Sequence, residues 1–174
     1  EGWVYVCAVL DLFTRKIVGW AIAGHMTRER VLDALRMAYA KRKAGRGLIF
    51  HSDRGSQYAS AEVRRWLAER GLRQSMSGTG NCYDNARMES FWHSLKVEET
   101  RGQDFATRAQ AQHCVFAYSE GSYNTTRMHS SLGYQSPTHF ERAYRVQSLK
   151  AANDTPINKH SNHSPSAQLN KKAT

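Results

Sequence analysis

The chain has 174 residues and a formal net charge of +10, with 40% hydrophobic and 10% aromatic residues. This length and apolar content suit one globular domain with a real core. No stretch approaches the ~18 consecutive apolar residues of a membrane span, and the N-terminus lacks the layout of a signal peptide, so we expect a cytoplasmic protein. The cysteines Cys7, Cys82 and Cys114 are odd in number and widely spaced. They argue against a disulfide framework and against a zinc site.

The excess of basic residues predicts a polyanionic partner. Residues 145–174 hold five basic residues and one acid, so the larger part of the excess lies in the rest of the chain. We favour a nucleic acid contacted through its phosphates, and a merely solvated cationic surface is the alternative.

The chain opens with two segments, 3–10 and 16–23, that are rich in β-branched and aromatic residues. They predict two buried strands joined as an antiparallel hairpin. Asp11 lies in the connection, and an Asp that opens a turn commonly bonds its own backbone. We therefore favour a structural role for Asp11 over metal binding. Thr27 is placed to cap a helix that runs to about Lys43. The basic residues 41–46 suit either a DNA contact or an ordinary exposed helix end.

An alternation of strand and helix follows. Residues 48–50 are a short apolar run that predicts a buried strand, and Asp53 comes where that strand stops and its loop faces solvent. Ser60 begins a helix that Gly71 ends, and residues 72–76 are strand-like. This order predicts an α/β layer.

The stretch around Phe91 predicts a helix with one apolar stripe, with Asp84 or Asn85 as its cap. Four residues form the stripe at i, i+3, i+4 and i+7: Met88, Phe91, Trp92 and Leu95. At about 100° per residue, Glu89, His93 and Lys96 share a face beside it. A carboxylate and an ammonium would therefore project together from the rim of the core.

The C-terminal part predicts two more helices and a tail. Thr107 begins one helix, and Ser136 with Pro137 begins a short one. From about Val146 onward the chain is too polar to offset the entropy of ordering it. We therefore expect a core domain over 1–145 and a disordered tail over 146–174.

Asp53 and Glu89 are separated by the 35 positions 54–88, and Lys96 follows the glutamate by seven. This pattern resembles the last two acids, and the following basic residue, of the D,D-35-E integrase core of retroviral integrases and bacterial insertion-sequence transposases. Longer motifs, from residue 1 to about Tyr144, resemble the second-frame transposases of the third insertion-sequence family. They are His51-Ser52-Asp53-Arg54-Gly55-Ser56-Gln57-Tyr58, Asn81-Cys82-Tyr83-Asp84-Asn85-Ala86, Tyr123-Asn124, Arg127, His129-Ser130, Leu132-Gly133-Tyr134 and Ser136-Pro137.

The resemblance implies a ribonuclease-H-like mixed sheet flanked by helices, in a protein that cuts and joins DNA element ends as a homo-oligomer at the bacterial nucleoid. Asp53 and Glu89 would be the catalytic carboxylates and would hold two Mg²⁺ or Mn²⁺ ions, which prefer oxygen ligands. Five residues would contact the DNA: Lys96, Tyr83, Asn85, Arg127 and His129. The ordinary alternatives are an exposed helix lysine for Lys96, a helix cap for Asn85 and a structural histidine with satisfied hydrogen bonds for His129.

The first aspartate of the family's triad has no counterpart here. In the family it lies on the central strand of the sheet, just before the strand that begins here near Trp3. We therefore expect residues 1–174 to lack a metal ligand and a shared strand partner, to be poorly stable or prone to aggregation, and to be inactive alone. The alternatives are a nuclease of the same fold without strand transfer, a non-catalytic DNA-binding remnant, and a structural fragment without DNA affinity.

Overall fold

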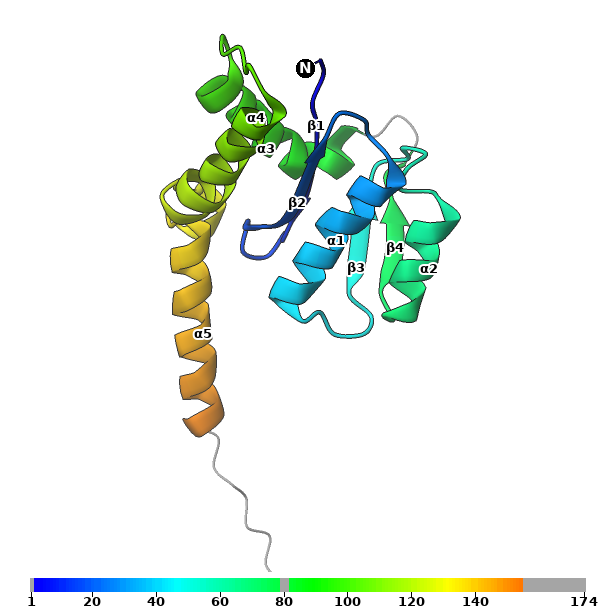
Figure 1. Ribbon diagram of the computed structural model, residues 1–174. Coiled ribbons are helices and arrows are strands. Elements are labelled where there is room, and N and C mark those ends of the chain that lie inside the picture. The colour runs from blue at the N-terminus through cyan, green and yellow to red at the C-terminus, as the bar shows by residue number, and fades with distance from the viewer. Residues whose placement is uncertain (1, 79–81, 155–174) are drawn as a thin grey trace, which may run out of the picture.

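The computed structural model describes residues 2–78 and 82–154, without the side chains of Cys82, Tyr83 and Asp154. Strands alternate with helices in the first half, and helices follow in the second (Figure 1). The strands are β1 (Tyr5–Leu10), β2 (Ile17–Ala23), β3 (Ile49–Ser52) and β4 (Arg73–Met76). The α-helices are α1 (Arg28–Arg42), α2 (Ala61–Glu69), α3 (Ala86–Leu95), α4 (Arg108–Phe116) and α5 (Pro137–Asp154). Short 3₁₀ segments occupy Cys82–Asn85 and Ser130–Leu132, and π-helical segments occupy Lys96–Thr100 and Ala117–Tyr123.

The β1–β2 hairpin is the centre of the fold, because helices cover both of its faces. Its strands pair antiparallel, as the sequence predicted. On one face, Cys7, Val9 and Ala21 pack into a core with α1 and α2. The other face packs against α3, α4 and the π-helical segment 117–123. The hairpin residues that pack on this face are Val6, Ala8, Leu10, Ile17, Trp20 and Ile22. Because side chains alternate along a strand, one hairpin serves two cores.

Helix α1 approaches β2 so closely that Gly19 has no room for a side chain. A Cβ at Gly19 would lie 2.1 Å from the Ala34 carbonyl oxygen and 3.0 Å from the Ala38 Cβ. The helix has the bounds that the sequence predicted: Thr27 occupies the N-cap position, and Lys43 adopts a left-handed conformation at the end. The Thr27 side chain makes no capping hydrogen bond.

Within the described residues the strands form two separate two-stranded sheets, β1 with β2 and β3 with β4. The second pair is parallel, so the strands as a whole are mixed, as expected. One edge of β1 and one edge of β3 have no strand partner in this part of the chain. Leu48 and Ile49 are 55% and 56% exposed, which contradicts the predicted burial of residues 48–50. The physical reason is that no described element covers this side of β3.

Asp11 has the structural role that the sequence favoured. Its Oδ1 accepts hydrogen bonds from the backbone N–H groups of Phe13 and Thr14, at 2.9 and 3.0 Å. Its Oδ2 lies 2.9 Å from Nε of Arg42. Arg42 also pairs with Glu141 of α5, so the hairpin turn, α1 and α5 are tied together by charge. Lys41 pairs with Glu120, so two cations of the 41–46 cluster form ion pairs within the chain.

The C-terminal half is joined to the hairpin through Asn124. This side chain is 1% exposed. Its Oδ1 accepts from the Ile17 backbone N–H at 2.8 Å, and its Nδ2 donates to the Ile17 carbonyl at 3.0 Å. The amide therefore pairs with the first residue of β2 as a neighbouring strand would. Both polar groups of a buried backbone position are satisfied from 107 residues away.

Helix α5 is longer than the sequence predicted. The expected core ended at 145 and the expected disordered tail began at 146, but the helix continues to Asp154. Leu, Lys, Gln and Ala are strong helix formers, so these residues extend the helix into solvent although they bury little. Residues 155–174 lie outside the described part. No helix in the described part is both long and apolar enough to cross a membrane.

We predict that Asn124→Ala lowers the free energy of unfolding by about 3 kcal/mol, because two buried backbone groups of Ile17 lose their partners. Chemical denaturation followed by tryptophan fluorescence measures this loss. The matched control, Ser122→Ala at an exposed position, should change stability by less than about 0.5 kcal/mol. A loss below about 1 kcal/mol for Asn124→Ala would contradict the role assigned to the amide.

We also predict that the chain self-associates through the unpartnered edge of β3, because exposed strand edges with apolar side chains pair with other chains. Ile49→Lys should reduce this association, since charges on an edge oppose pairing. Sedimentation velocity over a concentration series measures it. Leu149→Lys removes an equally exposed apolar side chain from α5 and should leave the association unchanged. Equal effects of the two substitutions would exclude the strand edge as the contact.

Candidate active site and nucleic-acid interface

Asp53 follows the last residue of β3 and is exposed. Its Oδ1 accepts a hydrogen bond from the Gly55 backbone N–H at 2.8 Å. A Cβ at Gly55 would lie 2.9 Å from that same oxygen, so a side chain there would displace the carboxylate from its present position. The structure thus confirms that Asp53 stands at a strand end facing solvent.

The residues beside Asp53 hold its loop in place. The ring nitrogens of His51 lie 3.0 Å from the Ser75 hydroxyl and 3.3 Å from the Ser77 hydroxyl. Nε of Arg54 donates to the Ser77 carbonyl at 2.8 Å. These bonds connect His51 in β3, and Arg54 just after Asp53, to the C-terminal end of β4. The sequence motif around Asp53 drew attention to these residues, but it did not reveal that they position the loop.

Asp53 also lies near β1. The thiol of Cys7 is 3.8 Å from the Tyr58 hydroxyl. Burial raises the pKa of both groups, and the negative charge of Asp53 raises both further. The thiol and the phenol therefore stay protonated at neutral pH.

Glu89 lies on α3, which has the apolar stripe that the sequence predicted. Phe91 and Leu95 are buried, and Glu89, His93 and Lys96 are all exposed. Lys96 keeps right-handed helical dihedral angles, φ −64° and ψ −46°. The glutamate and the lysine therefore project from one solvent-facing side of the helix.

The segment before α3 differs from the expected cap. Asn85 occupies the N-cap position, but its side chain makes no capping hydrogen bond. The Asp84 side chain accepts a hydrogen bond from the Gly78 backbone N–H at 2.9 Å, which ties the start of the helix to the preceding loop. Tyr83 lies in the 3₁₀ segment, and its side chain is outside the described part, as are residues 79–81.

Arg127 and His129 come together around Tyr123. The rings of Tyr123 and His129 meet edge to face, with centroids 5.1 Å apart, and Arg127 pairs with Glu98. Burial lowers the pKa of His129, and the positive charges of Arg127 and Arg15 lower it further. The imidazole is therefore neutral at pH 7, and the arginine is the charged member of this pair.

The structure does not join all of the predicted site residues. Within residues 2–78 and 82–154, no hydrogen bond or ion pair links Asp53 to Glu89, or either carboxylate to Arg127 or His129. The same residues contain no group of three or more His, Cys, Asp or Glu side chains that could hold a metal ion. The two carboxylates do supply the oxygen donors that Mg²⁺ and Mn²⁺ prefer. They fit a divalent ion in chemistry, but as an incomplete ligand set.

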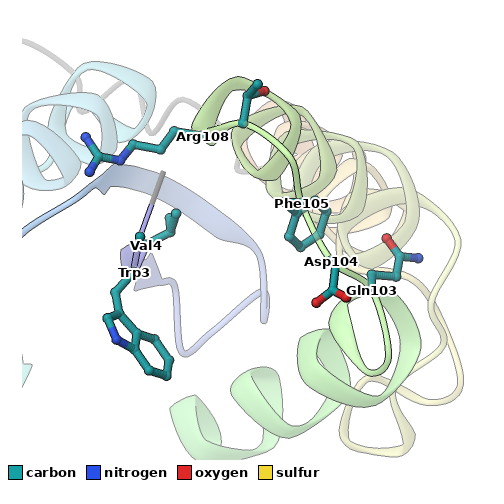
Figure 2. A pocket seen from close by; sticks show the side chains of 8 residues that line it. Trp3, Val4, Gln103, Asp104, Phe105 and Arg108 are labelled. Atoms are coloured by element: carbon teal, nitrogen blue, oxygen red, sulfur yellow. The ribbon is translucent and has the colours of Figure 1, made fainter.

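A pocket of about 420 Å³ lies apart from these residues. Trp3 and Val4 line one side of it, and Gln103, Asp104 and Phe105 line the other (Figure 2). It contains none of the predicted metal-binding or DNA-binding residues.

Solved structures define the class of fold. The chain resembles the catalytic core domain of bovine immunodeficiency virus (BIV) integrase, with a TM-score of 0.58 and 16% identity, over 87% of this chain and 93% of that one. It also resembles a chain of the simian T-cell lymphotropic virus intasome in complex with PP2A regulatory subunit B56 gamma. The TM-score there is 0.62 with 13% identity, over 98% of this chain and 55% of that one. At these identities the likeness shows the fold alone, which is the ribonuclease-H-like fold that the sequence predicted.

Sequence comparison defines the family. Two models described as integrase core domain match residues 1–82 and 70–137. The chain is 48% identical over 141 residues to transposase InsF for insertion sequence IS3A of Escherichia coli K12. This match covers 81% of the chain and 49% of the relative, so the chain spans about half the length of that transposase. The chain belongs to the integrase core family, among the transposases of the third insertion-sequence family.

Proposed function

We propose that this chain is the catalytic core of an insertion-sequence transposase, which cleaves DNA phosphodiester bonds and joins the ends to other DNA. One observation carries the proposal: in a chain of this family, Asp53 at the end of β3 and Glu89 on α3 are exposed carboxylates separated by 35 residues. Within the described part, neither of them has an ion-pair partner.

Asp53 and Glu89 are the proposed ligands of Mg²⁺ or Mn²⁺. When bound, such ions neutralise charge on the entering and leaving oxygens of a phosphodiester. The chain's own contribution is to hold the carboxylates in place. The Gly55 N–H orients Asp53, and the buried stripe of α3 fixes the side of the helix that carries Glu89.

We further propose that residues 1–174 alone neither cleave nor join DNA. A pair of ions shares several carboxylates, whereas the described part holds no third acid in a cluster with Asp53 and Glu89. The missing ligand would come from another segment or another chain. The same observation favours the second candidate, a DNA-binding module without catalysis, and an assay of cleavage separates the two.

DNA is the proposed partner, and a homo-oligomer is the proposed active form. The net charge of +10 supports a polyanionic partner. Joining two element ends requires two copies of the site near each other, which supports an assembly of several chains. The proposed DNA contacts are Lys96, Asn85, Tyr83, Arg127 and His129.

We predict that Asp53→Asn and Glu89→Gln each abolish metal-dependent cleavage and joining, in a version of the chain extended to the length of its relatives. DNA binding should change by less than about threefold, because the metal ligands are not the main phosphate contacts. Cleavage of end-labelled DNA in Mg²⁺ and fluorescence anisotropy provide the two measurements. The control Asp33→Asn removes an exposed acid that pairs with Arg30 and Arg36 on α1, and should leave cleavage intact. Near-normal cleavage by either site variant would refute the assignment.

We predict that Lys96→Ala weakens DNA binding and lowers the slope of log K against log salt by about one, as for a single lost phosphate contact. The comparison is Lys150→Ala, which removes an exposed lysine from α5 and should leave the slope unchanged. An unchanged slope for Lys96→Ala would make this lysine an ordinary helix surface residue.

A further inference from the structure

Four cations from two connections of the chain lie at one end of the β3–β4 pair. Lys43 and Arg46 stand between α1 and β3, and Arg70 and Arg73 stand between the end of α2 and the start of β4. In Figure 1 both connections lie at the lower end of the two strands. We call these four side chains the basic turn cluster.

Backbone hydrogen bonds hold the two connections together. The Gly47 N–H donates to the Gly71 carbonyl at 2.7 Å, and the Arg73 N–H donates to the Leu48 carbonyl at 2.9 Å. The side chain of Arg46 lies across Gly71, because a Cβ at that glycine would be 3.1 Å from both Cγ and Nε of Arg46. The arginine of one connection therefore packs directly on the other connection.

Arg70 is held in place by aromatic rings. Its guanidinium carbon lies 4.1 Å from the centroid of the Trp66 ring and 5.7 Å from that of the Tyr39 ring. Its Nη1 donates to the Trp66 carbonyl at 3.1 Å. Because the planar group is already oriented by these contacts, it loses little side-chain entropy when it binds an anion.

Little negative charge opposes the basic turn cluster. Glu69 lies 3.5 Å from Nη1 of Arg70, and both side chains contact solvent, which screens their attraction. Lys43, Arg46 and Arg73 are exposed. Within residues 2–78 and 82–154, the side chains of these three form no ion pair. The positive charge of the cluster is therefore available to a partner.

The basic turn cluster and Asp53 stand at opposite ends of the same strands. Strands β3 and β4 are parallel. The cluster lies where both strands begin, whereas Asp53 follows the last residue of β3. The four residues of β3 span roughly 13 Å at about 3.3 Å per residue. A phosphate group bound by the cluster is therefore not the phosphodiester that Asp53 would serve.

We propose that the basic turn cluster binds the phosphate backbone of duplex DNA away from the scissile phosphodiester, and so holds the DNA without taking part in the chemical step. Arginine suits this ligand, since its guanidinium presents parallel N–H donors to phosphate oxygens. Cations that no acid neutralises also displace the counterions of DNA, which favours binding. The choice of DNA as the ligand rests on the proposed function.

The inference also divides the basic run 41–46, which suited either a DNA contact or an ordinary helix end. Lys41 and Arg42 form ion pairs within the chain, so they serve the fold. Lys43 and Arg46 come after the end of α1 and belong to the proposed DNA surface.

The first test uses Arg46→Gln, Arg73→Gln and the double variant, with anisotropy of a fluorescein-labelled duplex of mixed sequence. Each single substitution should lower the affinity on the order of eightfold at 0.1 M salt, as for one phosphate contact. The slope of log K against log salt should fall by about one for each single variant and by about two for the double variant.

The matched control is Arg36→Gln, which makes the same change of charge at an exposed arginine paired with Asp33 on α1. It should leave the slope unchanged. Unchanged slopes for Arg46→Gln and Arg73→Gln, in variants whose Tm equals that of the wild type, would overturn the proposal. Equal losses for all three single variants would show a general charge effect and would also overturn it.

A gain of affinity provides a test that misfolding cannot imitate. Glu69→Gln removes the acid that pairs with Arg70, so the affinity for the duplex should rise by about twofold. Asp33→Asn makes the same change of charge on α1, beside Arg30 and Arg36, and should leave the affinity unchanged. No gain for Glu69→Gln, or equal gains for the two variants, would contradict the proposed surface.

Cleavage by the chain extended to the length of its relatives tests the position of the surface. Arg46→Gln/Arg73→Gln should raise the DNA concentration that gives half the maximal rate, and should change the rate at saturating DNA by less than about twofold. A lower rate at saturating DNA with an intact fold would place the cluster at the scissile phosphodiester and refute the proposal.

Two further outcomes separate the proposal from its alternatives. If the salt slopes stay unchanged while sedimentation velocity shows weaker self-association of the double variant, the basic turn cluster is a contact between copies of the chain and the proposal is wrong. Retained cleavage by Asp53→Asn would instead refute the proposed catalytic site. It would not alter the salt slopes, so the failure of one proposal is distinguishable from the failure of the other.

Discussion

The pairing of the Asn124 side chain with the backbone of Ile17 is the contact on which the rest of the molecule depends. It places a donor and an acceptor against the first residue of β2, in a position that water does not reach. Tyr123, the preceding residue, is thereby set into the core against Phe91, with ring centroids 5.0 Å apart. The loop that carries Arg127 and His129 follows directly. One side-chain amide thus couples the hairpin, the helix that carries Glu89 and the loop that carries Arg127 and His129.

The hairpin between two cores explains how two distant acids are presented by one small domain. The core with α1 and α2 contains Phe50 and Tyr58, which flank Asp53 in sequence. The core with α3 and α4 contains Phe91 and Leu95, which fix the direction of Glu89. Each carboxylate is exposed, whereas Phe50 and Tyr58 are partly buried and Phe91 and Leu95 are buried, so packed residues support a solvated surface.

Much of the local structure was predictable, because it depends on short spacings. The stripe on α3, the Ser60 start of α2 and the Thr107 start of α4 are all observed. The wrong predictions concern segments whose structure depends on contacts, or on missing contacts, that local sequence rules do not describe. Asn85 stands at the N-cap of α3, but its side chain makes no capping hydrogen bond. Residues 146–154 are helical, because helix propensity acts there without burial. Residues 48 and 49 are exposed, because no described strand covers them.

The sequence by itself determined which residues stand at the proposed site: a carboxylate after a strand, another beside a helical stripe, and the motifs that carry the family resemblance. These follow from periodicity and order along the chain, which need no tertiary contact. Only the tertiary structure decided that Asn124 completes the backbone bonding of Ile17, that His51 and Arg54 hold the Asp53 loop, and that Arg127 pairs with Glu98. Such contacts join residues far apart in the chain. Their partners are set by how two cores pack on one hairpin, and no local spacing encodes that packing.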